Sequence, residues 1–593
     1  MQPQSSKITG PIPPGWPRTN QPRTIAILGW ARLALQAAEG TGYNLSASEL
    51  AAGLVLMGHR VIYLSSGIQY SIIPGMRIRP RETWRGIECH ELINSPNLSP
   101  SAANIQNPRR EAESKKQSEL VVSFLKDQGV EIVHSHSLEG QGLDLIGAIK
   151  AAGMPVVVTL HNYWHVCPQV DLIYNEHELC FDYEGGRRCT GCLNESKPGV
   201  RKVKRIAMRI AERSLGPKQA ELIKQKSRRL IHRAINGDDT PGIVQRQPQP
   251  DPELASGHSI GERTDTAVEH AFVGSGTKAF REPAPLPIDA NEKFLENREV
   301  HLRVLNDYGR RRIAGIGALN SADLITPPTD HNARLHASMG VDPARLRVVP
   351  YGQPHFDQIN RRARRSPFYE HSPWRAETAS RPLRFGFFGT VRPNKGLEVL
   401  LRAIEHLDTD IRKRCQFVIR AHGGDWAFRK RMAKYPEVNF LGGYDLLQLI
   451  AAGGEYDVGV LPHIWMDNSP LVMWEHLHAG KMILAARLGG AADTVTPLDN
   501  PHGHPGNGLF FPGGQPEKLA ERITQLISGE YAIPSPSDVH KATTLTSYPE
   551  HVTTVDAIYT ELLERRLSRS TAAVPVPCSW RSGGSDGCWR AAP

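Results

Sequence analysis

The chain has 593 residues, of which 40% are hydrophobic and 22% are charged, values typical of a globular protein of roughly two to four domains. It lacks any run of about 18 apolar residues, which excludes a membrane-spanning helix, and its eight cysteines are too sparse for a disulfide scaffold. The polar, proline-rich N-terminus has no apolar region of a secretory signal, so we expect a cytoplasmic protein.

The net charge of +10 is concentrated in one segment. Residues 201–233 contain twelve Lys or Arg and two Glu, a local charge of +10, and the remaining residues balance at 59 against 59. This distribution argues against a nucleic-acid partner. Because Ile206 and Ile210 lie among the cations, the segment predicts an amphipathic helix with peripheral contact at the anionic inner membrane surface. A solvated helix face is the alternative.

The first part of the chain predicts an α/β domain. A strand at 25–28, a helix at about 45–57 and a strand at 61–64 form a βαβ unit. Further buried strands are expected at 131–133, 156–160 and 347–350, which together indicate one parallel sheet.

A second α/β alternation follows. We expect a strand at 384–388, a helix at 396–407, strands near 416–420, 457–462, 482–485 and 509–511, and a last amphipathic helix at 549–566. The first domain is therefore predicted at 23–200 and 291–375, the second range including a linker, with a basic segment and flexible insertion at 201–290 between its two parts. The second domain is predicted at 376–545 and a terminal helix at 546–568. Segments 1–22 and 569–593 are predicted to be disordered.

Ligands of open parallel sheets bind beyond the carboxyl ends of the strands, so the residues after each strand are candidates. After the first strand, the loop that includes Gly42 and Tyr43 opens a helix whose amides could hold a phosphate; a tight turn is the alternative. His161 follows the strand at 156–160, which delivers its side chain to the crevice; a structural histidine is the commoner role of a lone His.

Two loops of the second domain carry charged side chains. Thr390, Arg392 and Lys395 lie between a strand and a helix, where two cations beside a helix N-terminus can neutralise a diphosphate. No Walker A motif is present. Asp467 follows another strand and Glu475 lies on the next helix, where its carboxylate could accept both hydroxyls of a ribose. A helix-capping acid and a solvated helix acid are the alternative interpretation.

Four cysteines follow His161 with the spacing C-x12-C-x8-C-x2-C. Four thiols that end in CxxC fit a tetrahedral structural zinc, and reduced thiols without metal are the alternative. The predicted ligands are Cys167, Cys180, Cys189 and Cys192.

Taken together, these motifs resemble the retaining glycosyltransferases of family 4. The resemblance rests on Lys395-Gly396, the acids at 467 and 475, Gly480 and Gly489-Gly490, with the loop at 40–43 and the run 158–162 in the first domain. It covers about residues 24–200 and 295–565. It implies a GT-B fold: two facing Rossmann-like domains with parallel sheets and an interdomain cleft, the acceptor bound mainly by the first domain and a nucleotide-sugar by the second.

The resemblance also implies residue roles. Glu475 would hold the ribose, and Lys395 with Arg392 would bind the diphosphate. Asp467 would lie near the transferred sugar, and His161 would lie by its C6 hydroxyl and support positive charge at C1 through its carbonyl or its ring. The predicted catalytic residues are thus His161, Lys395, Asp467 and Glu475, and the predicted substrate-binding residues are Gly42, Tyr43, Thr390, Arg392, Asn468, Ser469, Pro470 and Leu471. The chain departs from the family at Thr390, where many members have Arg, and at Asp467, where Glu is usual.

We therefore expect an enzyme that transfers a sugar, with retention, from a nucleotide-sugar to a hydroxyl acceptor. A UDP- or GDP-sugar is the expected donor, and a glycan, a lipid-linked molecule or a small molecule is the expected acceptor. No metal is expected to be required for catalysis, because fixed cations can stabilise the leaving diphosphate. The alternatives are a sugar-nucleotide or glycan-binding scaffold with weakened turnover, which the two departures favour, and a sugar-nucleotide epimerase of the same fold.

Overall fold

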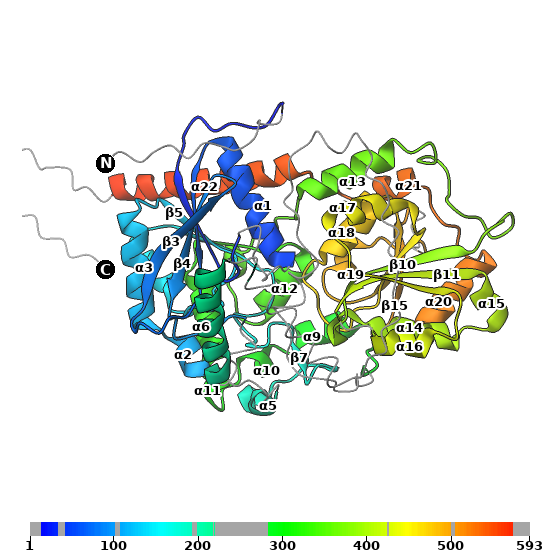
Figure 1. Ribbon diagram of the computed structural model, residues 1–593, viewed down its shortest axis with the longest axis horizontal. Coiled ribbons are helices and arrows are strands. Elements are labelled where there is room, and N and C mark those ends of the chain that lie inside the picture. Colours follow the sequence, from blue (N-terminus) through cyan, green and yellow to red (C-terminus); the bar gives the residue numbers. More distant parts are fainter. Residues whose placement is uncertain are drawn as a thin grey trace, which may run out of the picture.

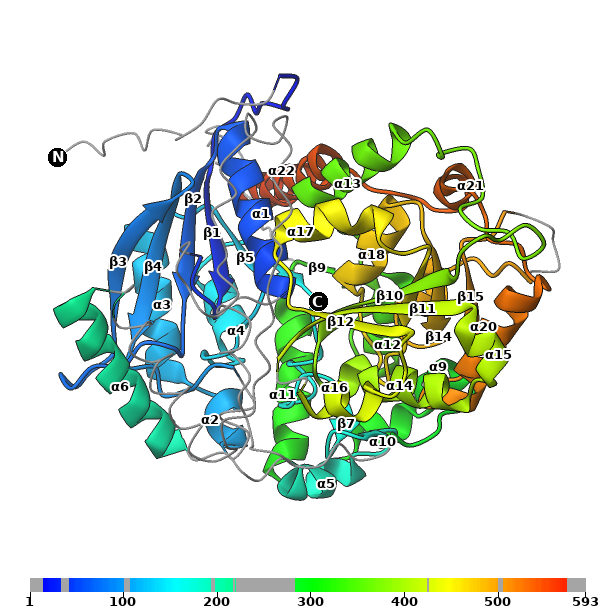
Figure 2. The same ribbon diagram turned by 45° about the vertical axis from the view of Figure 1, so that its right-hand side comes forward.

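A computed structural model describes residues 14–33, 42–100, 107–192, 198–216, 219, 283–423, 426–499 and 505–572. Two α/β domains stand side by side, with the first in blue to green and the second in yellow to orange (Figure 1). Each is built on its own sheet, and Figure 2 shows both sheets with helices around them. The predicted fold class, two facing Rossmann-like α/β domains, is confirmed.

The first sheet has the strand order β3-β4-β2-β1-β5-β6-β9. Its strands are β1 (Thr24–Gly29), β2 (Arg60–Ser65), β3 (Arg77–Trp84), β4 (Ile87–Ile93), β5 (Ile132–Ser135), β6 (Val156–Thr159) and β9 (Leu324–Thr326). All neighbours pair in parallel except β3, which is antiparallel to β4. The expectation of one parallel sheet is therefore wrong at this edge, where β3 and β4 form a hairpin with charged residues on the exposed side.

The strand predicted at 347–350 is wrong as well. The seventh strand is β9, and residues 347–350 run beside it without forming a regular ladder. The N–H of Arg347 donates to the carbonyl of Ile325, and that of Val349 donates to the carbonyl of Pro327. Pro350 has no N–H to continue the ladder, because proline removes that donor.

The second sheet has the order β12-β11-β10-β13-β14-β15, and every pair is parallel. Its strands are β10 (Leu383–Thr390), β11 (Cys415–His422), β12 (Val438–Gly442), β13 (Val458–Leu461), β14 (Met482–Ala486) and β15 (Gly508–Phe511). Five of them match predicted strands, while β12 was not predicted because its residues are only partly buried.

Helices surround both sheets. Those between β1 and β9 and after it are α1 (Gly42–Met57), α2 (Pro108–Ala112), α3 (Lys115–Asp127), α4 (Leu145–Ala151), α5 (Arg187–Gly191), α6 (Pro198–Leu215), α9 (Ala290–Glu296), α10 (Arg298–Leu302), α11 (Asp307–Ser321), α12 (Asp330–Ser338) and α13 (Pro354–Arg364). Those of the second domain are α14 (Leu397–His406), α15 (Thr409–Lys413), α16 (Trp426–Met432), α17 (Leu446–Ala451), α18 (Leu471–His478), α19 (Ala491–Thr494), α20 (Pro516–Ser528) and α21 (Pro536–Lys541). Short pieces are the hairpin β7 (Ile173–Tyr174) and β8 (Glu178–Leu179) and the 3-10 turns at Glu184–Gly186, Pro343–Arg345, Pro393–Lys395 and Ala452–Gly454.

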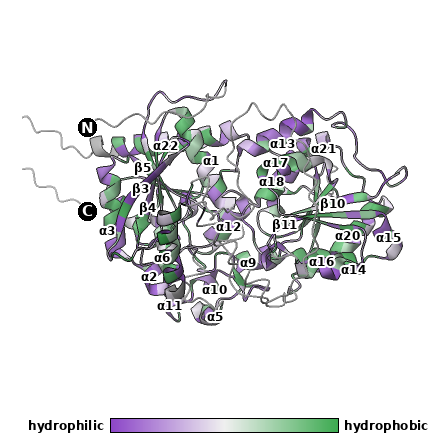
Figure 3. Cartoon of the chain, viewed as in Figure 1, coloured by the Kyte–Doolittle hydropathy of each residue, from purple (hydrophilic) through white to green (hydrophobic). Residues whose placement is uncertain are grey.

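The last helix, α22 (Tyr548–Ala572), returns to the first domain. It runs along that domain in red, beside α1 and β5 (Figure 1). Val552, Val555 and Tyr559 are buried in a core cluster with residues of α1, β1 and β2, and the Tyr548 hydroxyl donates to the Glu49 carbonyl at 2.6 Å. The strands at the centre of both domains carry hydrophobic residues, as Figure 3 shows.

Parts of the predicted flexible ranges lie outside the described residues, namely 1–13, most of 217–282 and 573–593. Their described flanks make contacts: the Trp16 ring lies 5.0 Å from that of Tyr548, and the N–H of Leu286 donates to the Gly513 carbonyl. Within the described ranges, none of the helices is both long and apolar enough to cross a membrane.

Candidate active site

The predicted site residues gather where the carboxyl ends of β6 and β13 meet between the domains. Two contacts fix this meeting: the Tyr163 hydroxyl donates to the Met466 carbonyl at 2.6 Å, and the Asn468 side-chain amide donates to the Leu160 carbonyl at 3.1 Å. Tyr163 and Leu160, on either side of His161, are thus hydrogen-bonded to the two neighbours of Asp467. The structure therefore brings the predicted sites of the two domains together.

His161 is enclosed by other rings of the first domain. Its Nδ1 lies 2.7 Å from the Tyr351 hydroxyl and its Nε2 lies 2.8 Å from Nδ1 of His136, and both rings stack on it. Burial lowers the pKa of His161 to about 3, with a smaller contribution from His551, so the ring is neutral at pH 7. Both ring nitrogens are thus engaged within the first domain.

Lys395 and Asp467 form an ion pair in the second domain. Lys395 Nζ lies 2.8 Å from Asp467 Oδ2 and stands over the Trp465 ring. His463 Nδ1 is 3.9 Å from the same carboxylate oxygen, and burial, aided by the Lys395 charge, lowers the pKa of His463 to about 3. Asp467 therefore meets one fixed cation, Lys395, which is the predicted ligand of the diphosphate.

Two glycines allow this close approach. Gly396 has φ +71, and a Cβ there would lie 1.7 Å from the Pro462 carbonyl at the end of β13. Gly489 has φ +58, and a Cβ there would lie 2.3 Å from the Asp467 carbonyl, whose oxygen accepts the Gly490 N–H at 2.7 Å. Side chains at either position would separate the loops that carry Lys395 and Asp467.

Glu475 is buried on α18 and faces α13. Its Oε1 lies 3.2 Å from His355 Nε2. Burial raises the pKa of the Tyr444 and Tyr456 hydroxyls, and the negative charge of nearby Glu475 raises both pKa values further. Glu475 is thus a buried carboxylate with polar neighbours rather than a solvated helix acid.

Arg392 lies where the first domain reaches the second. Burial lowers its pKa to about 10, opposed by the charges of Asp171 and Glu176 from the segment that contains the cysteines. Burial likewise raises the pKa of Asp171 to about 7, opposed in part by Arg392. Thr390, at the end of β10, has a buried hydroxyl that finds no hydrogen-bond partner in the described part of the chain. The predicted diphosphate ligand Arg392 therefore borders both domains.

Among the remaining predicted substrate-binding residues, Gly42, Leu471 and Asn468 lie at the contact between the domains. A Cβ on Gly42 would lie 3.4 Å from the Leu471 side chain, so the start of α1 faces the start of α18. The Tyr43 ring packs between Trp30 and His161. The Asn468 carbonyl accepts from Thr329 and the Ser469 hydroxyl accepts from the Trp474 indole N–H, while Pro470 precedes α18.

The four predicted zinc ligands are free thiols. Burial raises the pKa of Cys180 to about 12 and of Cys189 to about 11, and the charges of neighbouring cysteines add to both shifts. The Cys192 thiol donates to Gln169 Oε1 at 2.7 Å. Among the described residues, no group of three or more His, Cys, Asp or Glu side chains is arranged to hold a metal ion, and the zinc site stays a prediction.

Sequence reasoning missed His136, Tyr351 and His355. His136 directly follows the carboxyl end of β5, so the rule that selected His161 could have found it. Tyr351 and His355 follow an irregular segment and carry no comparable signal.

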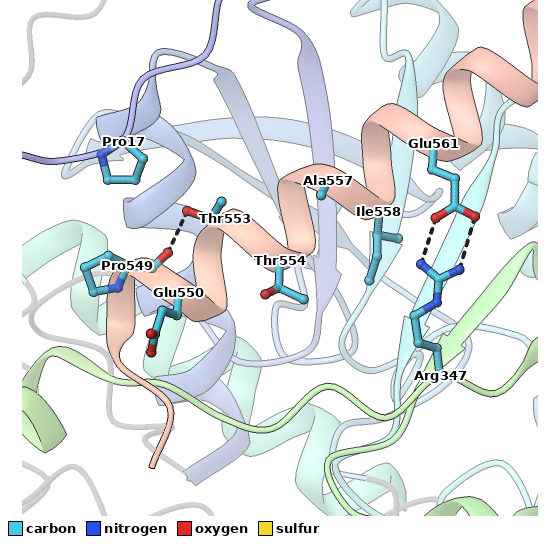
Figure 4. Close-up of a pocket in the computed structure, with 9 residues that line it drawn as sticks. All are labelled: Pro17, Arg347, Pro549, Glu550, Thr553, Thr554, Ala557, Ile558 and Glu561. Carbon is cyan, nitrogen blue, oxygen red and sulfur yellow. Dashed lines mark hydrogen bonds and ion pairs between the residues drawn. The ribbon is translucent and has the colours of Figure 1, made fainter. Parts of the chain in front are cut away.

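A pocket of about 610 Å³ lies elsewhere, on α22, and Figure 4 shows its lining. Pro17 and Arg347 border it, and Arg347 is paired with Glu561 of α22. None of the predicted site residues lines this pocket, so the pocket is separate from the candidate site.

Comparison with known proteins bears on the second domain. Residues 382–529 match the family model described as Glycosyl transferases group 1, a range that includes the whole sheet from β10 to β15 and α20. The second domain is therefore similar to a glycosyltransferase domain over this range. The match includes Lys395, Asp467 and Glu475, but not His161.

Similar solved structures include Alr3699/HepE from Anabaena in complex with UDP and glucose, at 12% identity and a TM-score of 0.45, covering 91% of this chain and 100% of that one. Sucrose-phosphate synthase from Thermosynechococcus elongatus has 14% identity and a TM-score of 0.49, covering 92% and 100%. An α,α-trehalose-phosphate synthase from Burkholderia xenovorans has 11% identity and a TM-score of 0.46, covering 91% and 100%. Among curated proteins, none matches the sequence. Residue roles are not transferred at these identities.

Proposed function

We propose that the protein transfers a sugar, with retention, from a nucleotide-sugar to a hydroxyl acceptor. The observation that carries this proposal is the Lys395–Asp467 pair, which lies in the range similar to a glycosyltransferase domain and is held against the His161 segment of the first domain. A single fixed cation beside a carboxylate at such an interface suits a reaction that needs stabilisation of a leaving diphosphate and exclusion of water.

In this proposal each charged residue has a separate task. Lys395 and Arg392 bind the diphosphate, and Lys395 meets the negative charge that grows on it as the glycosidic bond breaks. Glu475 accepts the ribose hydroxyls, supported by His355 at 3.2 Å. Asp467 orients the transferred sugar, and the backbone at His161 faces the positive charge at C1. The acceptor oxygen bonds to C1 from the face that the diphosphate leaves, and the acceptor's proton passes to the departing phosphate oxygen, which gives retention.

The test begins with a thermal-shift screen of UDP, GDP, ADP and CMP and their sugars. A ligand at 100 times its Kd should stabilise the protein by about 2.7 kcal/mol. The nucleotide-sugar that stabilises most is then incubated with the protein, and release of free sugar and transfer to acceptors are followed by NMR, which also gives the anomeric configuration. Tight binding without release or transfer would indicate a binding scaffold, and an inverted product would exclude retention.

We also propose peripheral contact with anionic membranes through α6. Its outer face exposes Val203 at 66% and Ile210 at 51%, with Lys204 beside them. Arg205 instead donates to the Gly67 and Ser99 carbonyls, and Arg209 pairs with Glu91 at 2.9 Å. The contact would therefore combine an apolar stripe with fewer free cations than the sequence alone indicated. In Figure 2 this helix lies on the side of the first domain away from the second.

Vesicle flotation tests this contact. Binding to anionic vesicles at low salt should fall when Val203 and Ile210 are both changed to Asp, because apolar area and charge attraction both contribute. Leu447→Asp, at an equally exposed position of the second domain, is the control. Equal flotation of the wild-type protein with neutral and anionic vesicles would reject the proposal.

A further inference from the structure

His136 is a buried histidine beside the candidate site with one unused ring nitrogen. His134, two residues earlier on β5, has both ring nitrogens hydrogen-bonded, to the Tyr559 hydroxyl at 2.6 Å and to the Thr159 hydroxyl at 2.7 Å. His136 is 4% exposed, its Nδ1 is bonded to His161, and its Nε2 has no hydrogen-bond partner among the residues that the structure describes. A buried polar atom without a partner costs free energy, so it calls for an explanation.

The chain of hydrogen bonds from Tyr351 through His161 determines whether Nε2 of His136 carries a proton. In the described part of the chain the Tyr351 hydroxyl bonds only His161, so the buried O–H is satisfied when it donates to Nδ1 of His161. A neutral His161 then carries its proton on Nε2 and donates it to Nδ1 of His136. A neutral His136 must in turn carry its own proton on Nε2. Tyr351 and His161 thus fix a tautomer that presents an N–H donor.

The surroundings of this donor indicate an oxygen-bearing ligand. His136 follows the carboxyl end of β5, the edge at which parallel sheets bind ligands. The rings of His136, His161, Tyr43 and Trp30 form a continuous series, with centroids 5.0 to 5.8 Å apart. An N–H donor at the end of an aromatic series suits a ring that carries hydroxyl groups.

We propose that the Nε2–H of His136 binds a hydroxyl oxygen of a pyranose acceptor, and that Tyr351 and His161 position it by fixing its tautomer. This proposal rests on the proposed function and narrows its acceptor to a sugar. His136 would touch the substrate, whereas Tyr351 would act through the two rings. A buried water on Nε2 is the competing explanation.

A matched pair of substitutions separates the two nitrogens. The side-chain amide of Gln reaches the ε position and can replace the Nε2 donor, whereas that of Asn reaches only the δ position and can replace the bond to His161. With the nucleotide-sugar from the screen and glucose, mannose or galactose as acceptor, the ratio of transfer to donor hydrolysis should fall roughly 5- to 100-fold in His136→Asn and much less in His136→Gln. His331→Gln on α12 is the control, since His331 is also buried with an unpartnered Nε2 and should leave the ratio unchanged.

The reverse order, with Gln worse than Asn, would show that the bond to His161 is what matters and would overturn the proposal. Equal ratios of transfer to hydrolysis in the wild type and both variants would show that Nε2 binds a water rather than the acceptor, and would also overturn the proposal. So would a wild-type protein that hydrolyses its donor and transfers to none of the three pyranoses. A wild-type protein without any turnover would instead refute the proposed function itself.

The tautomer is tested without turnover. NMR of protein with ring-labelled histidine should show His136 protonated on Nε2, assigned by loss of the signal in His136→Gln, and Tyr351→Phe should redistribute that proton between the two nitrogens. A His136 protonated on Nδ1 in the wild-type protein would refute the positioning chain.

Discussion

The ion pair between Lys395 and Asp467 gives the sharpest prediction, because the same lysine is proposed to bind the diphosphate. Two unit charges 2.8 Å apart attract by about 6 kcal/mol at an effective dielectric constant of 20. Lys395 keeps a quarter of its side chain exposed, so solvent screens this attraction. For a hydrogen bond between charged groups, about 1.5 to 3 kcal/mol is the net value to expect.

Donor binding must then compete with Asp467 for Lys395. Asp467→Asn should remove this competition and tighten binding of the free nucleoside diphosphate by roughly 10- to 100-fold. Transfer of the sugar should nevertheless fall, because the carboxylate that orients it is lost. Lys395→Met should weaken diphosphate binding by a similar factor and lower kcat by on the order of 100-fold or more, since its charge acts most strongly on the departing group.

Isothermal titration calorimetry with the nucleoside diphosphate and with the intact nucleotide-sugar measures both effects. Lys395→Met with Asp467→Asn completes a double-mutant cycle and gives the coupling between the two side chains. Weaker diphosphate binding in Asp467→Asn would refute the competition and show that Asp467 instead holds Lys395 in place for the ligand. Wild-type affinity and turnover in Lys395→Met would refute the site assignment as a whole.

Three further predictions concern other parts of the molecule. Glu475→Ala should weaken nucleotide binding by about 1.5 to 3 kcal/mol and abolish any preference for a ribose over a deoxyribose, measured by calorimetry with paired nucleotides; a preference that persists would place the ribose elsewhere. Protein purified without chelator should contain one zinc per chain by metal analysis if the four cysteines bind it, whereas four titratable thiols without zinc would exclude the site. Burial lowers the pKa of several histidines to about 3, so they stay neutral in the folded chain while the unfolded chain takes up protons below about pH 6.5; they include His134, His161, His165, His463 and His476. Each of them should lower the free energy of unfolding by about 1.4 kcal/mol for every pH unit of acidification, so unfolding monitored by circular dichroism should occur between about pH 6 and 4. A stability that does not change over that range would contradict their burial.

The buried strands and the residues after them could be predicted because their signals are local. Strands such as Val156–Thr159 and Val458–Leu461 are mainly apolar and wholly buried, and the rule that ligands bind at carboxyl ends led to His161 and Asp467. The hairpin of β3 and β4 could not be predicted in this way, since β3 carries three Arg and one Glu and none of its residues is buried. Short β9 has only three residues and lies far along the chain from its partner β6.

The partners of the site residues depend on contacts that the sequence does not reveal. Tyr351 reaches His161 across 190 positions, and His355 reaches Glu475 across 120. The pairing of Lys395 with Asp467 across 72 positions was likewise absent from the sequence analysis, which assigned both residues to a ligand. Such pairings are set by how loops and helices pack around the strand ends, and local patterns do not encode this.

The return of α22 to the first domain has a consequence for the order of folding during synthesis. The second domain, from β10 to α21, is complete once its own residues have left the ribosome. The first domain is not, because the cluster that includes Val552, Val555 and Tyr559 is supplied by the last helix, and Tyr559 also holds His134 at 2.6 Å. The domain made first should therefore reach its native state last, and a nascent chain released before residue 548 should carry a folded second domain and an unfinished first one.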